Sequence, residues 1–276
     1  MTVGKALITA AARSQRQLPL QTVVDRDGAT RSVLEMLVRE AQSAGVEEVG
    51  VVIAPEDRAA YAMAVSSTAV QFIPQPQPLG YGDAILCARK FLGDEPFLHF
   101  VGDHLFLSRS NVSCAKQLVQ IAVREQCSVS GVQATREQAL PFYGTIGGRR
   151  VAGQTGLYEV ENVIEKPTPT VAEQSLIVPG LRAGHYLCFL GMHVLTPGVL
   201  DVLEELRSTR PTLSDGLARL TRRERFLALE VNAARYNVGV KYGLLIAQLA
   251  LVLGGPDRDE LLTQMLELLA NSAKGQ

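Results

Sequence analysis

The sequence lacks the marks of several large classes of protein. It has four cysteines in 276 residues, far apart and without a Cys-x-x-Cys pair, which argues against a zinc site and favours buried thiols in a reducing compartment. Its 27 Lys and Arg against 28 Asp and Glu give no basic excess of the kind that nucleic-acid binders carry. No apolar run reaches the roughly 18 residues of a membrane span, and residues 1–5 lack the layout of a signal peptide. We therefore expect a cytoplasmic protein without nucleic-acid or membrane partners.

The sequence does contain a regular alternation of short apolar runs and amphipathic stretches. Ser32 and Glu35 have the spacing of a capping box, which predicts that a helix begins there, between the first two apolar runs. Strands that alternate with helices in this way form sheets with helices on their faces. The pattern predicts an α/β fold with a doubly wound, mostly parallel sheet. Its expected strands are 6–9, 49–53, 70–73, 97–101 and 128–135.

After residue 139 the apolar runs become shorter and are separated by turns, which predicts an antiparallel addition to the sheet. Two other stretches carry local predictions. Residues 21–29 are polar and are expected to form a mobile loop, and Tyr236–Gly239 is expected to open a long helix that ends at Leu253. The expected strands of the addition are 143–148, 155–163 and 186–194.

The chain is expected to divide near its C-terminus. We predict a main domain over residues 1–255, with halves at 1–139 and 140–235. Residues 256–276 would form a separate C-terminal helix after Pro256. Its apolar face would dock either on the domain or on a second subunit of a homo-oligomer.

The central candidate for chemistry is Asp103. It follows Gly102 and the run 97–101, which is typical of a strand buried on both faces. In open α/β sheets ligands bind beyond the carboxyl ends of the strands, where a carboxylate can hold a divalent cation against phosphate oxygens. Asp103 is therefore a candidate metal ligand. The alternative is that Asp103 only caps the turn.

Three further loops are expected at the same edge of the sheet. Arg16 lies in the first, where a guanidinium can clamp a triphosphate. In the second, Gly80 precedes a helix and lets the backbone approach a flat or anionic ligand, while Gln75 can read the edge of a base. In the third, Glu165 can accept bonds from sugar hydroxyls and Lys166 can meet a phosphate. Each residue alone is also compatible with a solvated loop, which is the commoner place for a single arginine, glutamine or Glu-Lys-Pro, and the convergence of the loops is the signal.

Several stretches together resemble the sugar nucleotidyltransferases, and among them the bacterial UDP-glucose pyrophosphorylase family. Residues 80–96, Gly-Tyr-Gly-Asp-Ala-Ile-Leu-Cys-Ala-Arg-Lys-Phe-Leu-Gly-Asp-Glu-Pro, are similar to the family's G-L-G-H-A-V-L-C-A segment and its G-D-E-P end. Val163–Pro167 is similar to its V-V-E-K-P, and Tyr143-Gly144 to the Y-G that precedes a sugar-contacting strand. Lys5–Ile8 is similar to the opening K-A-V-I. The likeness covers nearly the whole chain.

The resemblance implies a Rossmann-like nucleotidyltransferase fold in which residues 1–139 bind the nucleotide. Ala11 and Ala12 would line the nucleotide loop, and Arg16 would be the arginine that ends the family's G-x-G-T-R. Gln75 would face uracil, with Gly80 nearby.

For the other half, 140–235, the resemblance implies a sugar site. Gly144 and Glu165 would contact glucose, and Lys166 would contact the sugar phosphate. Asp103 would bind Mg²⁺, and Asn237 stands where related enzymes have an aspartate as a second magnesium ligand. The residues that the resemblance marks as catalytic are Arg16, Asp103 and Lys166.

The sequence departs from the family pattern around the triphosphate. Ala12–Arg16 has neither the glycines nor the threonine of G-x-G-T-R, and a Cβ where the backbone passes close to phosphates narrows such a cradle. The lysine of the family's K-x-x-P-K segment has no counterpart, because residues 20–28 contain no lysine.

The resemblance implies the Mg²⁺-dependent transfer of a uridylyl group from UTP to glucose 1-phosphate, giving UDP-glucose and pyrophosphate. The departures leave two alternatives open. One is a sugar-nucleotide-binding protein with impaired turnover, since the sugar half is intact and the triphosphate half is eroded. The other is a nucleotidyltransferase with a different base or sugar.

Overall fold

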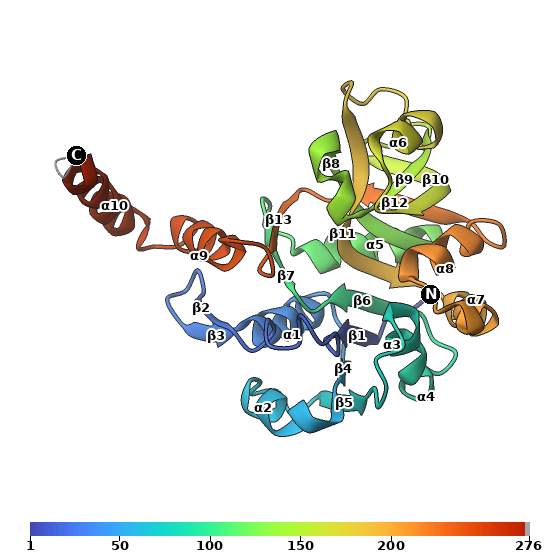
Figure 1. Cartoon of the computed structure of the whole chain (residues 1–276), viewed down its shortest axis with the longest axis horizontal. Helices are drawn as coiled ribbons and strands as arrows, with labels where there is room; N and C mark the ends of the chain where they lie inside the picture. The colour runs from blue at the N-terminus through green and yellow to red at the C-terminus, as the bar shows by residue number, and fades with distance from the viewer. Residues whose placement is uncertain (274–276) are drawn as a thin grey trace.

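The computed structural model describes residues 1–273, and within them a nine-stranded mixed sheet crosses the molecule in the order β5-β4-β1-β6-β11-β8-β12-β10-β9 (Figure 1). β1 pairs in parallel with β4 and β6, β4 with β5, and β8 with β12. β11 and β10 run antiparallel to their neighbours. The strands are β1 (Lys5–Thr9), β4 (Glu48–Ile53), β5 (Val70–Pro74), β6 (Phe97–Val101), β8 (Ser128–Arg136), β9 (Gly144–Arg150), β10 (Leu157–Glu165), β11 (His185–Leu195) and β12 (Phe226–Glu230).

The strands send alternate side chains into two apolar cores. In β1, Ala6 and Ile8 belong to one core and Leu7 to the other, and all three are fully buried. A strand that is covered on both faces has to be apolar throughout, which explains the continuous runs in β1 and β6. Helices α1 and α5 pack into the first core, and α3, α7 and α8 into the second. The α/β class predicted from the sequence is confirmed.

Helices follow Ser32 and Gly80, as the sequence predicts. Ser32 caps α1 by accepting a bond from the Glu35 amide at 2.9 Å. The predicted capping box is only half formed, because the Glu35 carboxylate bonds the backbone and hydroxyl of Ser66 instead. The helices are α1 (Val33–Ser43), α2 (Arg58–Met63), α3 (Tyr81–Cys87), α4 (Arg89–Leu92), α5 (Cys114–Glu125), α6 (Pro169–Ser175), α7 (Gly198–Leu206), α8 (Leu213–Leu220), α9 (Gly243–Leu253) and α10 (Arg258–Ala273).

The prediction of a mobile loop at 21–29 is wrong. The segment is part of a hairpin in which β2 (Thr22–Val24) pairs with β3 (Thr30–Ser32). Arg31 explains the order of the turn, since its guanidinium contacts Asp25 at 2.8 Å and Asp27 at 2.6 Å. The charges that suggested a solvated loop therefore pair with one another across it.

The prediction that Tyr236–Gly239 opens the long helix is also wrong. Tyr236 and Asn237 end a strand, β13 (Ala233–Asn237), which pairs antiparallel with β7 (His104–Ser108), and α9 begins only at Gly243. The pairing places Asn237 opposite His104, next to the end of β6. A partner about 130 residues away in the chain thus decides the local structure, which no local pattern could indicate.

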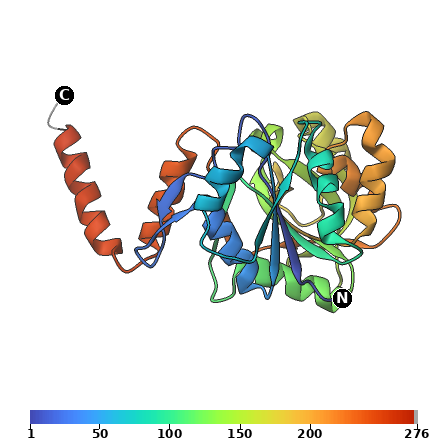
Figure 2. The same ribbon diagram turned by 90° about the horizontal axis from the view of Figure 1, so that it is seen from below.

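Helices α9 and α10 leave the body of the molecule as an arm (Figures 1 and 2). α9 packs on β13 and β2, and α10 packs on α9. The last three residues of the predicted terminal segment, 274–276, lie outside the described residues. Among the described residues, none of the helices has the length and apolar character needed to cross a membrane.

Candidate active site

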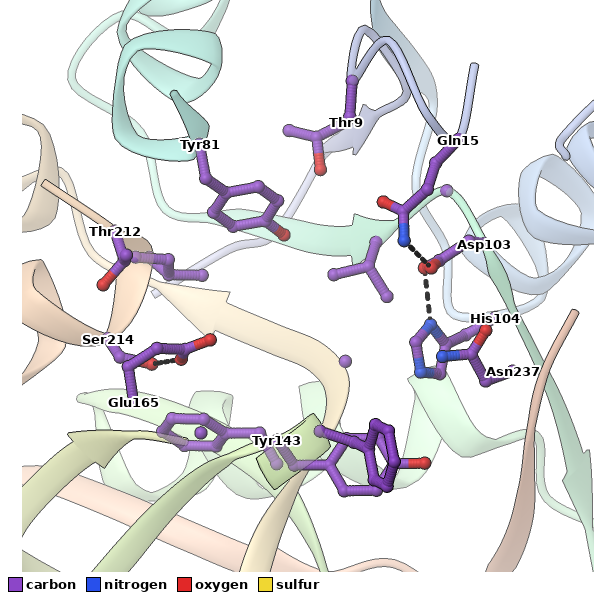
Figure 3. A pocket seen from close by; sticks show the side chains of 18 of the residues that line it. Thr9, Gln15, Tyr81, Asp103, His104, Tyr143, Glu165, Thr212, Ser214 and Asn237 are labelled. Carbon is purple, nitrogen blue, oxygen red and sulfur yellow. Dashed lines mark hydrogen bonds and ion pairs between the residues drawn. The ribbon is translucent and has the colours of Figure 1, made fainter. Parts of the chain in front are cut away.

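A cavity of about 360 Å³ opens at the carboxyl ends of β1 and β6 and extends to the start of α8 (Figure 3). Its walls come from segments far apart in the chain, because the carboxyl ends of neighbouring parallel strands meet at one edge of a sheet. Seven of the residues selected from the sequence line it: Ala11, Ala12, Asp103, Gly144, Glu165, Lys166 and Asn237.

Asp103 is held on both oxygens by its neighbours. Its Oδ2 accepts a hydrogen bond from Gln15 Nε2 at 2.9 Å, and His104 Nδ1 lies 2.6 Å from its Oδ1. The Asp103 backbone carbonyl accepts a bond from the Val238 amide at 2.9 Å, which ties the turn after β6 to the end of β13. The carboxylate is therefore fixed in direction and faces the cavity.

The oxygens at this end of the cavity fit a hard divalent cation. Mg²⁺ is commonly held by one or two carboxylates together with substrate phosphates and water. Asp103 supplies one carboxylate, and Asn237 supplies a neutral oxygen that now accepts the Gly239 amide at 2.8 Å. The described residues contain no group of three or more His, Cys, Asp or Glu side chains that could hold a metal by themselves. A cation here would depend on phosphate oxygens for much of its coordination.

At the other end, Gly144 and Glu165 face each other across β9 and β10. Glu165 Oε2 accepts a hydrogen bond from Ser214 Oγ at 2.5 Å. A Cβ at Gly144 would lie 2.6 Å from Ser214 Oγ and 2.9 Å from Glu165 Oε2, so only glycine leaves this contact intact. Lys166 is over half exposed, with its ammonium 3.9 Å from Glu165 Oε1.

Three of the residues selected from the sequence do not line the cavity. The Arg16 guanidinium turns away to pair with Glu56 and with Asp57 at 3.4 Å. Gln75 is buried, and its Nε2 donates to Gly80 O at 3.2 Å and to Asp83 Oδ2 at 2.8 Å. Their assigned roles in binding the nucleotide stay predictions.

Gly80 itself adopts φ +119°, a region that glycine occupies without strain, at the residue before α3. The positive φ agrees with the prediction of a glycine turn there. Its role next to the nucleotide stays a prediction as well.

Two buried histidines lie at the cavity, His193 in its wall and His99 behind it. His193 Nδ1 lies 2.6 Å from Ser130 Oγ, and its ring lies 5.7 Å from that of His99. Burial lowers the pKa of His193 to about 3 and that of His99 well below its ordinary value. Both imidazoles are neutral near pH 7, so they contribute hydrogen bonds rather than charge.

Arg235, which is partly buried, packs against two aromatic residues that line the cavity. Its guanidinium stacks on the Tyr143 ring, 3.6 Å from the centroid, and donates to the Phe189 carbonyl. Burial lowers the pKa of this guanidinium. Tyr143 and Phe189 both line the cavity, so Arg235 fixes two of its walls from behind.

Several residues that line the cavity are not predicted from the sequence. His104 could have been inferred, since it follows Asp103 directly. Ser214 could not, because no pattern in its own segment relates it to Glu165, 49 positions earlier. The cavity-lining polar and aromatic residues that were missed are Thr9, Gln15, Tyr81, His104, Phe142, Phe189, His193, Thr212 and Ser214.

Residues 17–240 match the family model of the nucleotidyl transferases. Among curated proteins, the chain is 28% identical over 299 residues to a UTP–glucose-1-phosphate uridylyltransferase of Streptococcus pneumoniae serotype 4 (strain ATCC BAA-334 / TIGR4), covering 96% of each. It is also 28% identical over 291 residues to a Streptococcus pyogenes uridylyltransferase of the same name, covering 94% of this chain and 91% of the relative.

Solved structures resemble this one over most of its length. A UDP-glucose pyrophosphorylase complexed with UDP-glucose has a TM-score of 0.75 at 24% identity, over 90% of this chain and 98% of its own. A UDP-glucose pyrophosphorylase from Acinetobacter baumannii has a TM-score of 0.78 at 24% identity, over 97% and 100%. At this identity the structural likeness establishes the fold alone.

The fold is that of the α/β nucleotidyltransferases, with a cavity at the carboxyl edge of its sheet. The chain belongs to the nucleotidyl transferase family, since the family model matches most of its length. It is an enzyme of this class whose relatives are uridylyltransferases.

Proposed function

We propose that the protein transfers a uridylyl group from UTP to glucose 1-phosphate, forming UDP-glucose and releasing pyrophosphate. The observation that carries this is the single cavity shared by Asp103 and by the pair Glu165 and Lys166. A carboxylate for a cation thus lies in the same space as a carboxylate and an ammonium suited to a sugar phosphate. The similarity to uridylyltransferases supplies the base and the sugar.

The reaction needs positioning and charge neutralisation more than proton transfer. A phosphate oxygen of glucose 1-phosphate attacks the α-phosphorus of UTP in line, and pyrophosphate leaves. Lys166 would orient the attacking phosphate, and Glu165, held by Ser214, would accept hydrogen bonds from glucose hydroxyls. Asp103, with Asn237, would hold Mg²⁺, which when bound neutralises phosphate charge.

The nucleotide would bind beside the loop after β1 and the turn before α3. Ala11 and Ala12 lie against the cavity and would face the nucleotide. Gln75 would present its amide oxygen to uracil, since its Nε2 is already engaged by Gly80 and Asp83. Residues 1–139 would form the nucleotide-binding half and 140–235 the sugar-binding half of one cytoplasmic enzyme.

Purified protein with UTP, glucose 1-phosphate and Mg²⁺ is expected to release pyrophosphate. Asp103→Asn should lower turnover about 100-fold or more, since it removes the one cavity carboxylate suited to the cation. Binding of UDP without metal, measured by calorimetry, should change little in this variant. Unchanged turnover in Asp103→Asn would show that the metal assignment is wrong.

One observation favours the alternative of impaired turnover. Gln15 bonds Asp103, and Arg16 pairs with Glu56 and Asp57 instead of facing the cavity. No pyrophosphate release, together with clear binding of UDP-glucose, would support that alternative. Release with another nucleotide or another sugar phosphate would instead indicate a different base or sugar.

A further inference from the structure

The Tyr81 hydroxyl points into the cavity from the start of α3 (Figure 3). The similar segment of the family, G-L-G-H-A, has leucine at this position, so the hydroxyl is a feature of this chain. Burial raises the pKa of this phenol, and the nearby carboxylates of Asp103 and Glu165 raise it further. Tyr81 therefore keeps its proton.

The hydroxyl is fixed by His99, which is completely buried behind it. His99 Nε2 lies 3.2 Å from the Tyr81 hydroxyl and 3.4 Å from Thr9 Oγ1, while its Nδ1 has no hydrogen-bond partner among the described residues. A neutral imidazole carries one proton, and a buried N–H without a partner costs more than a buried unpaired nitrogen acceptor. The proton therefore belongs on Nε2, which donates towards Tyr81 and Thr9.

This arrangement leaves the proton of Tyr81 for the cavity. When a hydroxyl accepts a bond from an imidazole, its own hydrogen is still available as a donor. The two nearby carboxylates already have hydrogen-bond partners. Asp103 contacts Gln15 and His104, and Glu165 accepts a bond from Ser214. Tyr81 thus presents its hydroxyl to the cavity from a fixed position beside Thr9 and His99.

Tyr81 lies next to the sugar end of the cavity. The amide of Gly82, the following residue, donates to Pro211 O at 3.1 Å. Pro211 precedes Thr212, which caps α8, and Ser214 in the first turn of α8 bonds Glu165. The start of α3 is therefore joined through the start of α8 to the carboxylate proposed to bind glucose.

We propose that Tyr81 is a specificity-determining residue, whose hydroxyl donates a hydrogen bond to an oxygen of the hexosyl group of the bound sugar nucleotide. The assignment rests on the proposed function, because it takes UDP-glucose as the ligand. A site built to hydrogen-bond a ligand hydroxyl discriminates strongly against groups that cannot complete the bond. Tyr81 and His99 together would thus select the sugar, and the base and phosphates would be bound elsewhere in the cavity.

The test compares UDP-glucose with UDP by calorimetry, on wild type, Tyr81→Phe and Tyr158→Phe. Tyr81→Phe keeps the ring and leaves Thr9 as a partner for His99, so the fold is expected to persist, which a thermal melt checks. It should weaken UDP-glucose binding about fivefold and leave UDP binding unchanged within about twofold. Tyr158→Phe is the matched control, because its hydroxyl bonds Glu230 outside this cavity, and it should change neither affinity.

The other outcomes separate the two proposals. Equal UDP-glucose affinity in wild type and Tyr81→Phe would overturn the role of Tyr81 and leave the proposed function intact. Equal weakening of UDP and UDP-glucose would also overturn it, since the hydroxyl would then act on the nucleotide or on the fold. A wild type that does not bind UDP-glucose would overturn the proposed function, and the assignment of Tyr81 with it.

Discussion

The rings of His193, in the cavity wall, and His99, behind it, lie 5.7 Å apart, and among the described residues no carboxylate pairs with either ring. Each is fully buried or nearly so, and their partners are hydroxyls. An imidazolium in such a place would lose its hydration and gain no counter-charge. The folded state therefore excludes the proton that the unfolded chain takes up freely near pH 6.5.

This exclusion makes stability depend on pH. The pKa of His193 falls to about 3 on folding, so between pH 6.5 and pH 3 the unfolded chain binds the extra proton. His193 does not lower the free energy of unfolding above pH 6.5. As the pH falls below 6.5 it lowers that free energy, by about 2 kcal/mol from pH 7 to pH 5. Urea unfolding at both pH values should show the loss in wild type and a shallower dependence in His193→Asn. Parallel dependences would mean that His193 is protonated in the folded state.

Single residues differ in how far the sequence predicts them. Asp103 and Glu165 were found because each follows an expected strand, and the carboxyl ends of strands meet at one edge of the sheet, whereas Gly144 was found through the resemblance. The sequence did not predict that Gln15 would bond Asp103 or that Arg16 would turn to Glu56, because these depend on side-chain directions within a turn. Such directions are set by tertiary neighbours, which spacing along the chain does not reveal.

At the scale of elements, the β2–β3 hairpin is tied to α9 by one side chain. Gln248 interrupts an otherwise apolar helix, and its amide bonds both backbone groups of Val24, accepting from the N–H at 2.8 Å and donating to the C=O at 3.0 Å. Gln248 thus bonds the backbone groups at the free edge of β2, which a further strand would otherwise pair. Gln248, the polar residue in α9, thus contacts Val24 in the segment 21–29 that was predicted to be a loop.

Gln248→Ala should loosen the hairpin locally and leave the domain almost as stable. The freed groups of Val24 are near solvent and can bond water, so the free energy of unfolding should fall by less than about 1 kcal/mol. Hydrogen exchange at the Val24 amide should accelerate about tenfold. Gln264→Ala is the matched control, since Gln264 bonds Glu260 within its own helix. Equal exchange in wild type and Gln248→Ala would contradict the contact.

The strands β1 and β6 were predictable because continuous apolar runs admit few alternatives. The strands β7 and β13 were not, although each has five residues as β1 and β6 do, because they depend on each other across the chain. The capping box was half right for the same reason, as Ser66 lies 31 positions from Glu35 and competes for its carboxylate.

At the scale of the whole molecule, the arm of α9 and α10 exposes several large apolar side chains. None of residues 258–271 in α10 is buried. Leu266 is 66% exposed and Leu269 65%, and on α9 Leu245 is 55% exposed. A helix gains most of its stability by burying its apolar face against a partner. We expect the partner to be a second copy of the same arm, since its leucines would cover these and the charged residues would remain in water.

We therefore expect a homodimer formed through α10. Light scattering behind gel filtration should give twice the chain mass of 29.8 kDa for wild type. The double variant Leu266→Glu with Leu269→Glu should elute as a monomer, because two charges per chain would oppose burial of the face. Glu267→Gln, on the same exposed turn, is the matched control and should remain dimeric. The monomeric variant should retain turnover, because the described residues of the cavity all precede the arm. A wild type that is monomeric even at high concentration would contradict the assignment and leave the apolar face of α10 to a different partner.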